Sequence, residues 1–296
     1  MAFWELRVAT SPDTSEGLTN FLWEQGALGV VEEELPGQPP RLRAFYPSSS
    51  AAAQLLSAVG DYRAALAALG FPVGDAPAEI GPIVDAEWAS AWQQSFPPRL
   101  VGQRLLIRPP WDSTRAPGRA DVVIEPGRAF GTGHHGSTEG CLALLDGLAG
   151  AWGGAPPARI LDVGIGTGIL AIAAIALGAA RVRGIDIDPD AVTASLHNAT
   201  LNGCANRLEV DLAAPADVEA GAAFDLVLAN LLTNAHLEFA REYRRLVAPG
   251  GALVLGGMLS SDGAQVEAAL RGAGFALGAR VDLEGWASLL LRRAHG

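Results

Sequence analysis

One stretch in the second half of the chain restricts the possible folds more than any other. Residues 160–168 read ILDVGIGTG, an apolar run that contains Asp162 and is followed by glycine at every second position. The apolar run has the length of a buried strand, and the residues after Gly168 continue as an apolar helix. Glycine adopts backbone conformations that other residues avoid, so this turn can approach a ligand closely. The segment therefore predicts a strand, a ligand-binding turn and a helix.

The rest of the second half continues this alternation. We expect extended segments at 105–108 and 122–125, core strands at 160–163, 181–185, 208–211, 224–229 and 252–256, helices at 169–177, 191–201, 237–247 and 265–272, and two closing strands. Strands that alternate with helices indicate βαβ units. The predicted fold class is α/β, with a Rossmann-like, mostly parallel sheet in residues 101–296.

The first 84 residues have a different pattern. Strands are expected at 3–8, 30–31, 41–46 and 80–84, with helices around 18–22 and at 51–69. The order βαββαβ is that of the ferredoxin-like split arrangement. The chain thus divides into a small ferredoxin-like α+β domain at 1–84, a helical linker at 85–100 and the α/β domain at 101–296. Trp88 and Trp92 share one face of the linker helix, which favours packing against a neighbouring domain.

The amino-acid composition restricts which class of binding partner is expected. The 296-residue chain has a formal net charge of −11, and all 21 of its basic side chains are arginines, which excludes a catalytic lysine. Proteins that follow a nucleic-acid backbone usually carry a basic face, so we expect a basic protein partner and no direct nucleic-acid contact.

The two cysteines bear on the cellular compartment. Cys141 and Cys204 lack zinc spacing and favour a reducing compartment. No signal peptide or membrane span is apparent, so we expect a cytoplasmic protein, with no signal for its oligomeric state.

Two classes of ligand use a turn of this type. Dinucleotides fit GxGxxG and place their pyrophosphate at the helix N-terminus, whereas methyltransferases that bind S-adenosylmethionine resemble DxGxGxG. Gly164, Gly166 and Gly168 match the second spacing, because the third glycine comes one position early for a dinucleotide. Asp162 would repel a pyrophosphate but not a ligand with sulfonium and ammonium groups. A glycine-rich turn without a ligand is the structural alternative.

Two strand ends supply further candidates. Asp186 follows Gly164 by 22 positions, about where an acidic side chain holds a ribose hydroxyl pair. Asp188 is expected to cap a helix that begins near Pro189. Asn230 ends a later strand, on the edge where open α/β sheets bind ligands, and its side chain can accept hydrogen bonds from an attacking amine. Alternatively, Asn230 only caps the next helix.

A glycine-containing segment precedes the core strands. Residues 125–138 read EPGRAFGTGHHGST, in which Gly-Thr-Gly can wrap a ligand. Ser137 and Thr138 can cap a helix that runs from Glu139. The adjacent His134 and His135 could suggest a metal site. Adjacent residues seldom face one ion, however, and no Cys, Asp or Glu cluster accompanies them, so we expect no metal.

These segments resemble the ribosomal protein L11 methyltransferase family (PrmA) over nearly the whole chain. Residues 125–138 look like that family's D/EPGxAFGTGxHxTT signature, which is far more specific than the glycine turn alone. Similar in order and context are residues 161–174, 184–189 and 229–231, and also Trp88, Trp92, Phe96, Arg99 and Pro110-Trp111. Ser137 replaces the usual threonine but keeps the hydroxyl, and residues 153–157 look like additional loop.

The resemblance implies a class I methyltransferase domain that uses S-adenosylmethionine, and an N-terminal domain that recognises the substrate. It implies methylation of lysine side-chain and N-terminal amines of ribosomal protein L11, a basic protein. Matched by position, the cofactor-binding residues are Thr138, Gly164, Asp186 and Asn230. To these we add Asp162, Gly166, Phe130, Gly131 and Thr132, and we assign the catalytic role to Asn230.

Three other functions stand as alternatives to this one. A methyltransferase with another acceptor, such as a different protein, RNA or a small-molecule amine, is the nearest. Residues 230–233 lack the prolines and the aromatic ring of the N/DPPY pattern, which disfavours glutamine or adenine as acceptor. The glycine spacing disfavours an NAD-dependent oxidoreductase. Asp162, Asp186 and Asn230 together disfavour a non-catalytic module that keeps only the fold.

Overall fold

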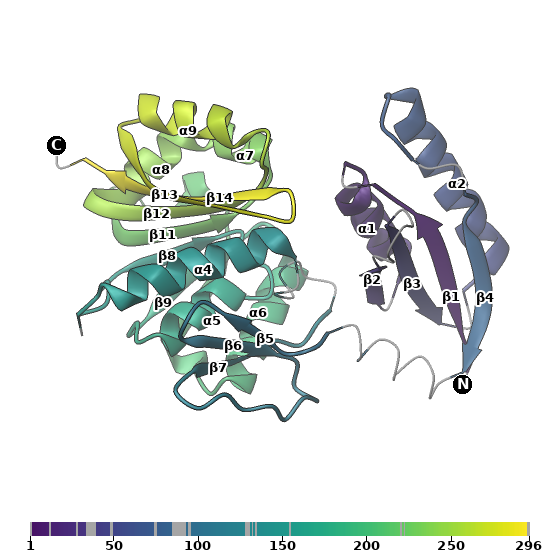
Figure 1. Cartoon of the computed structure of the whole chain (residues 1–296), viewed down its shortest axis with the longest axis horizontal. Coiled ribbons are helices and arrows are strands. Elements are labelled where there is room, and N and C mark those ends of the chain that lie inside the picture. Colours follow the sequence, from purple (N-terminus) through teal and green to yellow (C-terminus); the bar gives the residue numbers. More distant parts are fainter. Residues whose placement is uncertain are drawn as a thin grey trace. The chain divides into compact units, whose positions relative to one another are not determined.

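The computed structural model divides the chain into two compact units, Met1–Pro97 and Pro98–Gly296 (Figure 1). The structure describes residues 2–11, 13–27, 29–33, 40–47, 50–73, 76–84, 93, 96–127, 131, 133, 135–153, 155–219, 221 and 223–294. Of the predicted linker helix, residues 85–92 and 94–95, which include Trp88 and Trp92, lie outside the described residues. Arg99, at the end of that predicted linker, begins a strand.

The first unit is a four-stranded sheet with two helices. Its elements are β1 (Ala2–Ala9), α1 (Ser15–Glu24), β2 (Gly29–Glu33), β3 (Arg41–Pro47), α2 (Ala52–Ala68) and β4 (Glu79–Val84). The strand order is β2-β3-β1-β4, and all neighbouring strands are antiparallel. Alternate residues of the strands, such as Leu6 and Leu42, pack with Leu18 and Leu22 of α1. The strands expected at 30–31 and 41–46 are present as the antiparallel neighbours β2 and β3, whereas the ferredoxin-like class of this unit stays a prediction.

The second unit is built on a seven-stranded sheet. Its strands are β8 (Ile160–Val163), β9 (Val182–Asp186), β10 (Leu208–Leu212), β11 (Phe224–Asn230), β12 (Val247–Leu259), β13 (Phe275–Leu283) and β14 (Trp286–Arg293). The order is β10-β9-β8-β11-β12-β14-β13, parallel from β10 to β12 and antiparallel thereafter. The predicted α/β fold with a mostly parallel sheet is confirmed.

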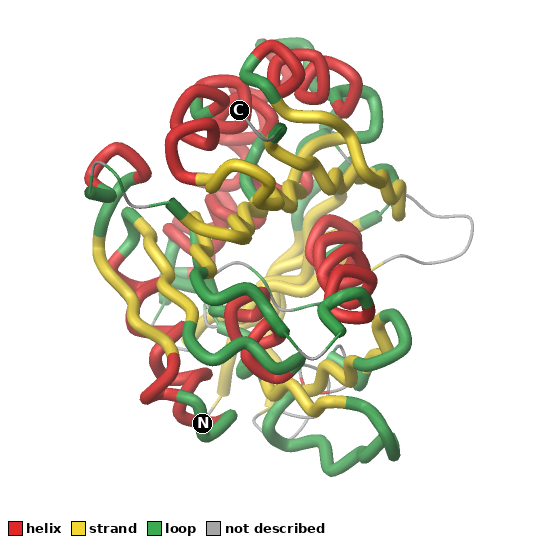
Figure 2. The backbone as a smooth tube through the Cα atoms, turned by 90° about the vertical axis from the view of Figure 1, so that its left-hand side faces the viewer, coloured by secondary structure: helices red, strands yellow, loops and turns green. Residues whose placement is uncertain are grey.

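Helices cover both faces of this sheet (Figure 1). On one face lie α4 (Gly136–Gly150), α5 (Ile169–Ala176) and α6 (Pro189–Leu201), and on the other α7 (Thr233–Glu238), α8 (Ala240–Leu246) and α9 (Gly263–Gly272); 3-10 turns cover Ala205–Arg207 and Pro215–Asp217. In Figure 2 the strands are yellow and the helices red. Ile160 packs in the core on the α4 face and Leu161 in the core on the α8 face. Burial of both faces explains why the strands read as continuous apolar runs.

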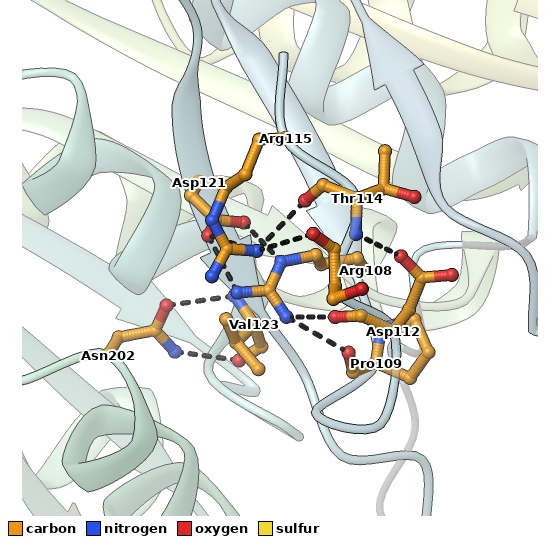
Figure 3. Close-up of polar contacts among 9 residues, drawn as sticks. Arg108, Pro109, Asp112, Thr114, Arg115, Asp121, Val123 and Asn202 are labelled. Atoms are coloured by element: carbon orange, nitrogen blue, oxygen red, sulfur yellow. Dashed lines mark hydrogen bonds and ion pairs between the residues drawn. The ribbon is translucent and has the colours of Figure 1, made fainter.

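A small second sheet precedes α4. It contains β5 (Arg99–Val101), which was not predicted, β6 (Leu105–Arg108) and β7 (Ala120–Val123), with β6 and β7 parallel. The connection between β6 and β7 is anchored by Arg108, which is 8% exposed. Its guanidinium pairs with both carboxylate oxygens of Asp121 at 2.8 and 2.7 Å and donates to the carbonyl of Asp112 (Figure 3). A bidentate ion pair of this kind fixes the orientation of the two side chains as well as their distance.

The helix predicted at 237–247 is wrong in its bounds. Two short helices, α7 and α8, stand there instead, with a break at Phe239, and Val247 already begins β12. His236 and Tyr243, on either side of this break, form a hydrogen bond of 3.0 Å. Both rings are fully buried, and the periodic pattern of this stretch gave no sign of the break between the two helices.

Candidate active site

The candidate residues gather at the carboxyl edge of the parallel strands. Asp162 lies in β8, Asp186 ends β9 and Asn230 ends β11. Within the seven-stranded sheet, β8 comes first in the sequence. It has β9 on one side and β11 on the other, so the strand order reverses beside it. Open α/β sheets bind ligands at such a switch point. The topology therefore brings together three residues that are far apart in sequence.

The glycine turn has the backbone that the sequence predicted. Gly164, Gly166 and Gly168 have φ of +69°, +53° and +82°, in the left-handed region. A Cβ on Gly164 would lie 2.4 Å from Cδ2 of Leu231, which follows Asn230. A side chain at this position would therefore push the glycine turn away from the end of β11.

Asp186 supports the glycine turn from the next strand. Its Oδ2 accepts a hydrogen bond from the Gly166 amide, and its Oδ1 accepts one from the Asp188 amide, both at 3.0 Å. Each carboxylate oxygen keeps further acceptor capacity for a ligand hydroxyl. Asp188 caps α6 by accepting from the Asp190 amide at 2.9 Å, with Pro189 at the start of the helix, as predicted.

Asp162 is a buried carboxyl beneath the turn. It is 1% exposed, and its Oδ2 accepts a hydrogen bond from the Ala171 amide at 3.1 Å. Burial raises the pKa of Asp162 well above its usual value; the Ala171 amide acts in the opposite direction, and the charge of Asp186 raises the pKa further. A cationic ligand nearby would stabilise the charged form of this carboxyl.

Asn230 pairs with Thr138 across the sheet edge. Its Nδ2 donates to Oγ1 of Thr138 at 3.1 Å, and Thr138 is fully buried in the first turn of α4. Its Oδ1 is buried and has no hydrogen-bond partner within the described part of the chain. A buried acceptor without a partner is costly, so this oxygen is suited to a ligand N–H. The alternative that Asn230 caps the next helix is wrong, because the residue at that position of α7 is Leu232.

The loop before α4 touches the glycine turn at Gly131. The Gly131 carbonyl accepts a hydrogen bond of 2.5 Å from the Thr167 hydroxyl, and a Cβ on Gly131 would lie 2.9 Å from that hydroxyl. Phe130 and Thr132 lie outside the described residues, so their predicted ligand contacts stay predictions. The predicted caps of the following helix are wrong, since α4 already begins at Gly136 and its N-cap is His135.

Asn198 was missed by the sequence reasoning. This residue of α6 is 1% exposed; its Nδ2 donates to the Thr167 carbonyl, and its Oδ1 accepts from the Glu125 amide, each at 2.9 Å. It thus joins the glycine turn to the start of the 125–138 loop. The sequence did contain a sign of this role. Asn198 lies on the same helix face as small apolar residues such as Ala191 and Ala199, and a polar side chain on a buried face needs hydrogen-bond partners.

Metal-binding clusters, membrane spans and reactive side chains would indicate other kinds of site. Across the described ranges, no group of three or more His, Cys, Asp or Glu side chains is arranged to hold a metal ion. No helix within those same ranges is both long and apolar enough to cross a membrane. Cys141 and Cys204 are buried free thiols. His134 lies outside the described residues, while Nδ1 of His135 is 2.7 Å from the hydroxyl of Ser137.

Known proteins resemble this chain over nearly its whole length. The family model described as Ribosomal protein L11 methyltransferase (PrmA) matches residues 2–294. The chain belongs to this family. Curated members are 38% identical over 97% of both chains in Azotobacter vinelandii and 37% identical over 99% of both chains in Pseudomonas aeruginosa, and both are named Ribosomal protein L11 methyltransferase.

A solved structure supports the PrmA fold of this chain. The crystal structure of a ribosomal protein L11 methylase from Lactobacillus delbrueckii subsp. bulgaricus is similar with a TM-score of 0.60 and 28% sequence identity. The match covers 67% of this chain and 99% of that one. The α/β unit thus has the class I methyltransferase fold, as predicted.

The cofactor of this methyltransferase family is S-adenosylmethionine, and the PrmA site fits it. The buried carboxyl of Asp162 suits a cationic ligand, and the rim position of Asp186 suits a hydroxyl pair. Oδ1 of Asn230, which has no partner among the described residues, offers an acceptor beside the glycine turn. The side chains of the site are therefore anionic or accept hydrogen bonds. Such a site matches a sulfonium ligand with an ammonium group better than it matches a pyrophosphate.

Proposed function

We propose that this PrmA family member transfers methyl groups from S-adenosylmethionine to lysine side-chain amines and the N-terminal α-amine of ribosomal protein L11. Family membership supports the reaction type, and the names of the relatives support the acceptor protein. One observation carries the choice of an amine: the buried Oδ1 of Asn230 receives no hydrogen bond from any residue that the structure describes. Ribosomal proteins are made in the cytoplasm, so the reaction would take place there.

Asn230 orients the acceptor in this proposal. S-adenosylmethionine supplies an electrophilic methyl group on a sulfonium. A lysine amine has a pKa of about 10.4 and is mostly protonated at neutral pH, so the site must select the neutral form. Oδ1 of Asn230 accepts one N–H of that amine and turns its lone pair toward the methyl carbon. Holding the two reactants in the right orientation can be worth roughly 7–11 kcal/mol in all, and Asn230 would supply part of this contribution.

The bonds and the proton balance without a general base. The amine nitrogen forms the new bond to carbon as the bond from carbon to sulfur breaks. The methylated ammonium product then releases a proton to water. His135 would be a poor base for an alkylammonium, because burial lowers its pKa to about 4.

Charge supports substrate recognition by the first unit. Residues 1–97 contain four arginines against twelve Asp and Glu side chains, whereas residues 98–296 contain seventeen against twenty. The formal net charge is therefore −8 for the smaller unit and −3 for the larger one. In the first unit, Arg7 and Arg43 pair with Glu5, and Arg41 pairs with Glu33. An acidic unit of this kind attracts a basic ribosomal protein, and it disfavours direct contact with nucleic acid.

Labelled methyl transfer tests the acceptor. Purified L11 and a basic non-ribosomal protein of similar size are incubated in parallel with the enzyme and radiolabelled S-adenosylmethionine. We expect label in L11 alone, and tandem mass spectrometry of the digested protein should place it on lysine side chains and the N-terminal amine. Equal labelling of both proteins, or label on side chains other than amines, would refute the proposed acceptor.

A further inference from the structure

His236 is a buried ionisable side chain that has no role in the proposed mechanism. It lies in α7, six residues after Asn230, and is 0% exposed. Its Nε2 is 2.7 Å from the Gly256 carbonyl, and its Nδ1 is 3.0 Å from the Tyr243 hydroxyl. Burial lowers the pKa of His236 to about 4, so the ring is neutral at physiological pH.

The two partners define which nitrogen carries the proton. A backbone carbonyl can only accept, so Nε2 must donate its hydrogen to Gly256. Nδ1 then has a free lone pair and accepts a hydrogen bond from the Tyr243 hydroxyl. Burial raises the pKa of Tyr243, which keeps this hydroxyl protonated. His236 is therefore held as one neutral tautomer.

The Gly256 carbonyl also holds the chain that follows Asn230. The Leu231 amide donates to this same carbonyl at 3.1 Å, and Gly256 lies opposite Asn230 in the register of β12 and β11. The two backbones are in close contact here. A Cβ on Gly256 would lie 2.9 Å from Oδ1 of Asn230, and one on Gly257 would lie 2.4 Å from the Leu231 carbonyl oxygen.

We propose that His236 is a positioning residue for methyl transfer: its Nε2–H fixes the Gly256 carbonyl, which in turn holds the Asn230–Leu231 backbone and keeps Oδ1 of Asn230 aimed at the acceptor amine. The inference rests on the proposed function, because it assumes that Oδ1 contacts an amine. Displacement of a reacting group by about 1 Å can cost a factor of about 100 in rate. One hydrogen bond on the backbone beside Asn230 is therefore sufficient to affect turnover.

Two substitutions at His236 separate positioning from packing. His236→Gln keeps an N–H donor that can reach the Gly256 carbonyl, whereas His236→Leu fills the space without a donor. For His236→Leu we expect kcat with L11 to fall about tenfold or more, while KM for L11 and the Kd of S-adenosylhomocysteine stay within about twofold. His236→Gln should restore kcat to within about threefold of the wild type.

A matched control accounts for loss of stability. Leu291→Val removes one methylene from the same core, at a strand position away from Asn230. It should lower the melting temperature and leave kcat per folded molecule unchanged. Wild-type kcat in His236→Leu, or equal loss of kcat in His236→Gln and His236→Leu, would overturn the inference.

Two spectroscopic measurements need no acceptor protein. Nitrogen-15 NMR of the wild type should show His236 as the tautomer with hydrogen on Nε2. Hydrogen exchange at the Leu231 amide should be slow in the wild type and in His236→Gln, and at least about tenfold faster in His236→Leu. The opposite tautomer, or equal exchange rates in all three proteins, would overturn the role of His236. Failure of the wild type to methylate L11 would instead overturn the proposed function.

Discussion

At the scale of single residues, the site is made of polar groups that are buried before any ligand binds. Oδ1 of Asn230 has no hydrogen-bond partner within the described residues, and the carboxyl of Asp162 is almost fully buried. Each arrangement costs folding free energy. Natural proteins keep such costs mainly at functional sites, where the ligand supplies the missing partner.

Replacement of Asp162 should stabilise the protein and weaken cofactor binding. The folded protein holds the Asp162 proton more tightly than the unfolded chain does, so this carboxyl lowers stability as the pH rises above its usual pKa of 3.8. At neutral pH without ligand, Asp162→Asn should raise the melting temperature by about 2–4 °C, the shift for 1 kcal/mol in a domain of this size.

The effect of Asp162→Asn depends on pH and on ligand. The gain in melting temperature should disappear in acid, where the wild-type carboxyl is protonated in both the folded and the unfolded state. Calorimetry should show that the Kd of S-adenosylmethionine increases by about tenfold. A ligand-free variant that is less stable than the wild type at neutral pH would contradict this account of Asp162.

Asp186 and Asp188 form a matched pair with different roles. Asp186→Ala removes the acceptor of the Gly166 amide and the expected ribose ligand, so the Kd of S-adenosylhomocysteine should increase by about 10- to 100-fold. Asp188→Ala removes only the cap of α6, and it should lower stability by about 1 kcal/mol with little change in that Kd. Calorimetry and thermal unfolding measure both; equal effects on Kd would show that Asp186 does not bind the ligand.

At the scale of elements, asparagines at the end of α6 form hydrogen bonds with the segment that leads into the 125–138 loop. Asn202, just after the helix, accepts from the Val123 amide at 2.8 Å and donates to the Val123 carbonyl at 2.6 Å (Figure 3). One turn earlier, Asn198 contacts Glu125 and also Thr167 of the glycine turn. Of these two asparagines, only Asn198 contacts the glycine turn and so reaches the cofactor site.

The two asparagines should therefore differ when each is replaced by alanine. Asn202→Ala and Asn198→Ala should each destabilise the protein by about 1–3 kcal/mol, because backbone groups that are at least partly shielded from water lose their partners. Only Asn198→Ala should also weaken S-adenosylhomocysteine binding, by about tenfold. Chemical unfolding and calorimetry give the two quantities. A comparable loss of binding in Asn202→Ala would indicate general damage to α6 instead.

The elements that local patterns define were the ones predicted from sequence. The glycine turn, Asp186 and the cap at Asp188 follow from short-range spacing, and the structure places each of them as expected. The break at Phe239 did not follow from the local pattern, and His236, just before it, bonds to a carbonyl 20 residues away. Asn198 was missed for the same reason, because its partner in the loop is 73 residues away.

At the scale of the whole molecule, the two units differ in charge. With a net charge of −8 on residues 1–97, attraction of a basic acceptor should contribute to encounter. Raising the ionic strength should therefore lower kcat/KM for L11 by about tenfold, mainly through KM. The Kd of S-adenosylhomocysteine, measured under the same conditions, should change by less than about twofold. A kcat/KM that is independent of salt would contradict recognition through charge.

The most direct test of the account is the intact mass of ribosomal protein L11 after incubation with the enzyme and S-adenosylmethionine. With the wild-type enzyme, L11 should gain mass in steps of one methyl group. With Asn230→Ala, the gain should be at least about tenfold slower, because the acceptor amine loses its orienting oxygen. If the mass of L11 is unchanged while the wild-type enzyme binds S-adenosylmethionine tightly, L11 is not the acceptor and the central claim is wrong.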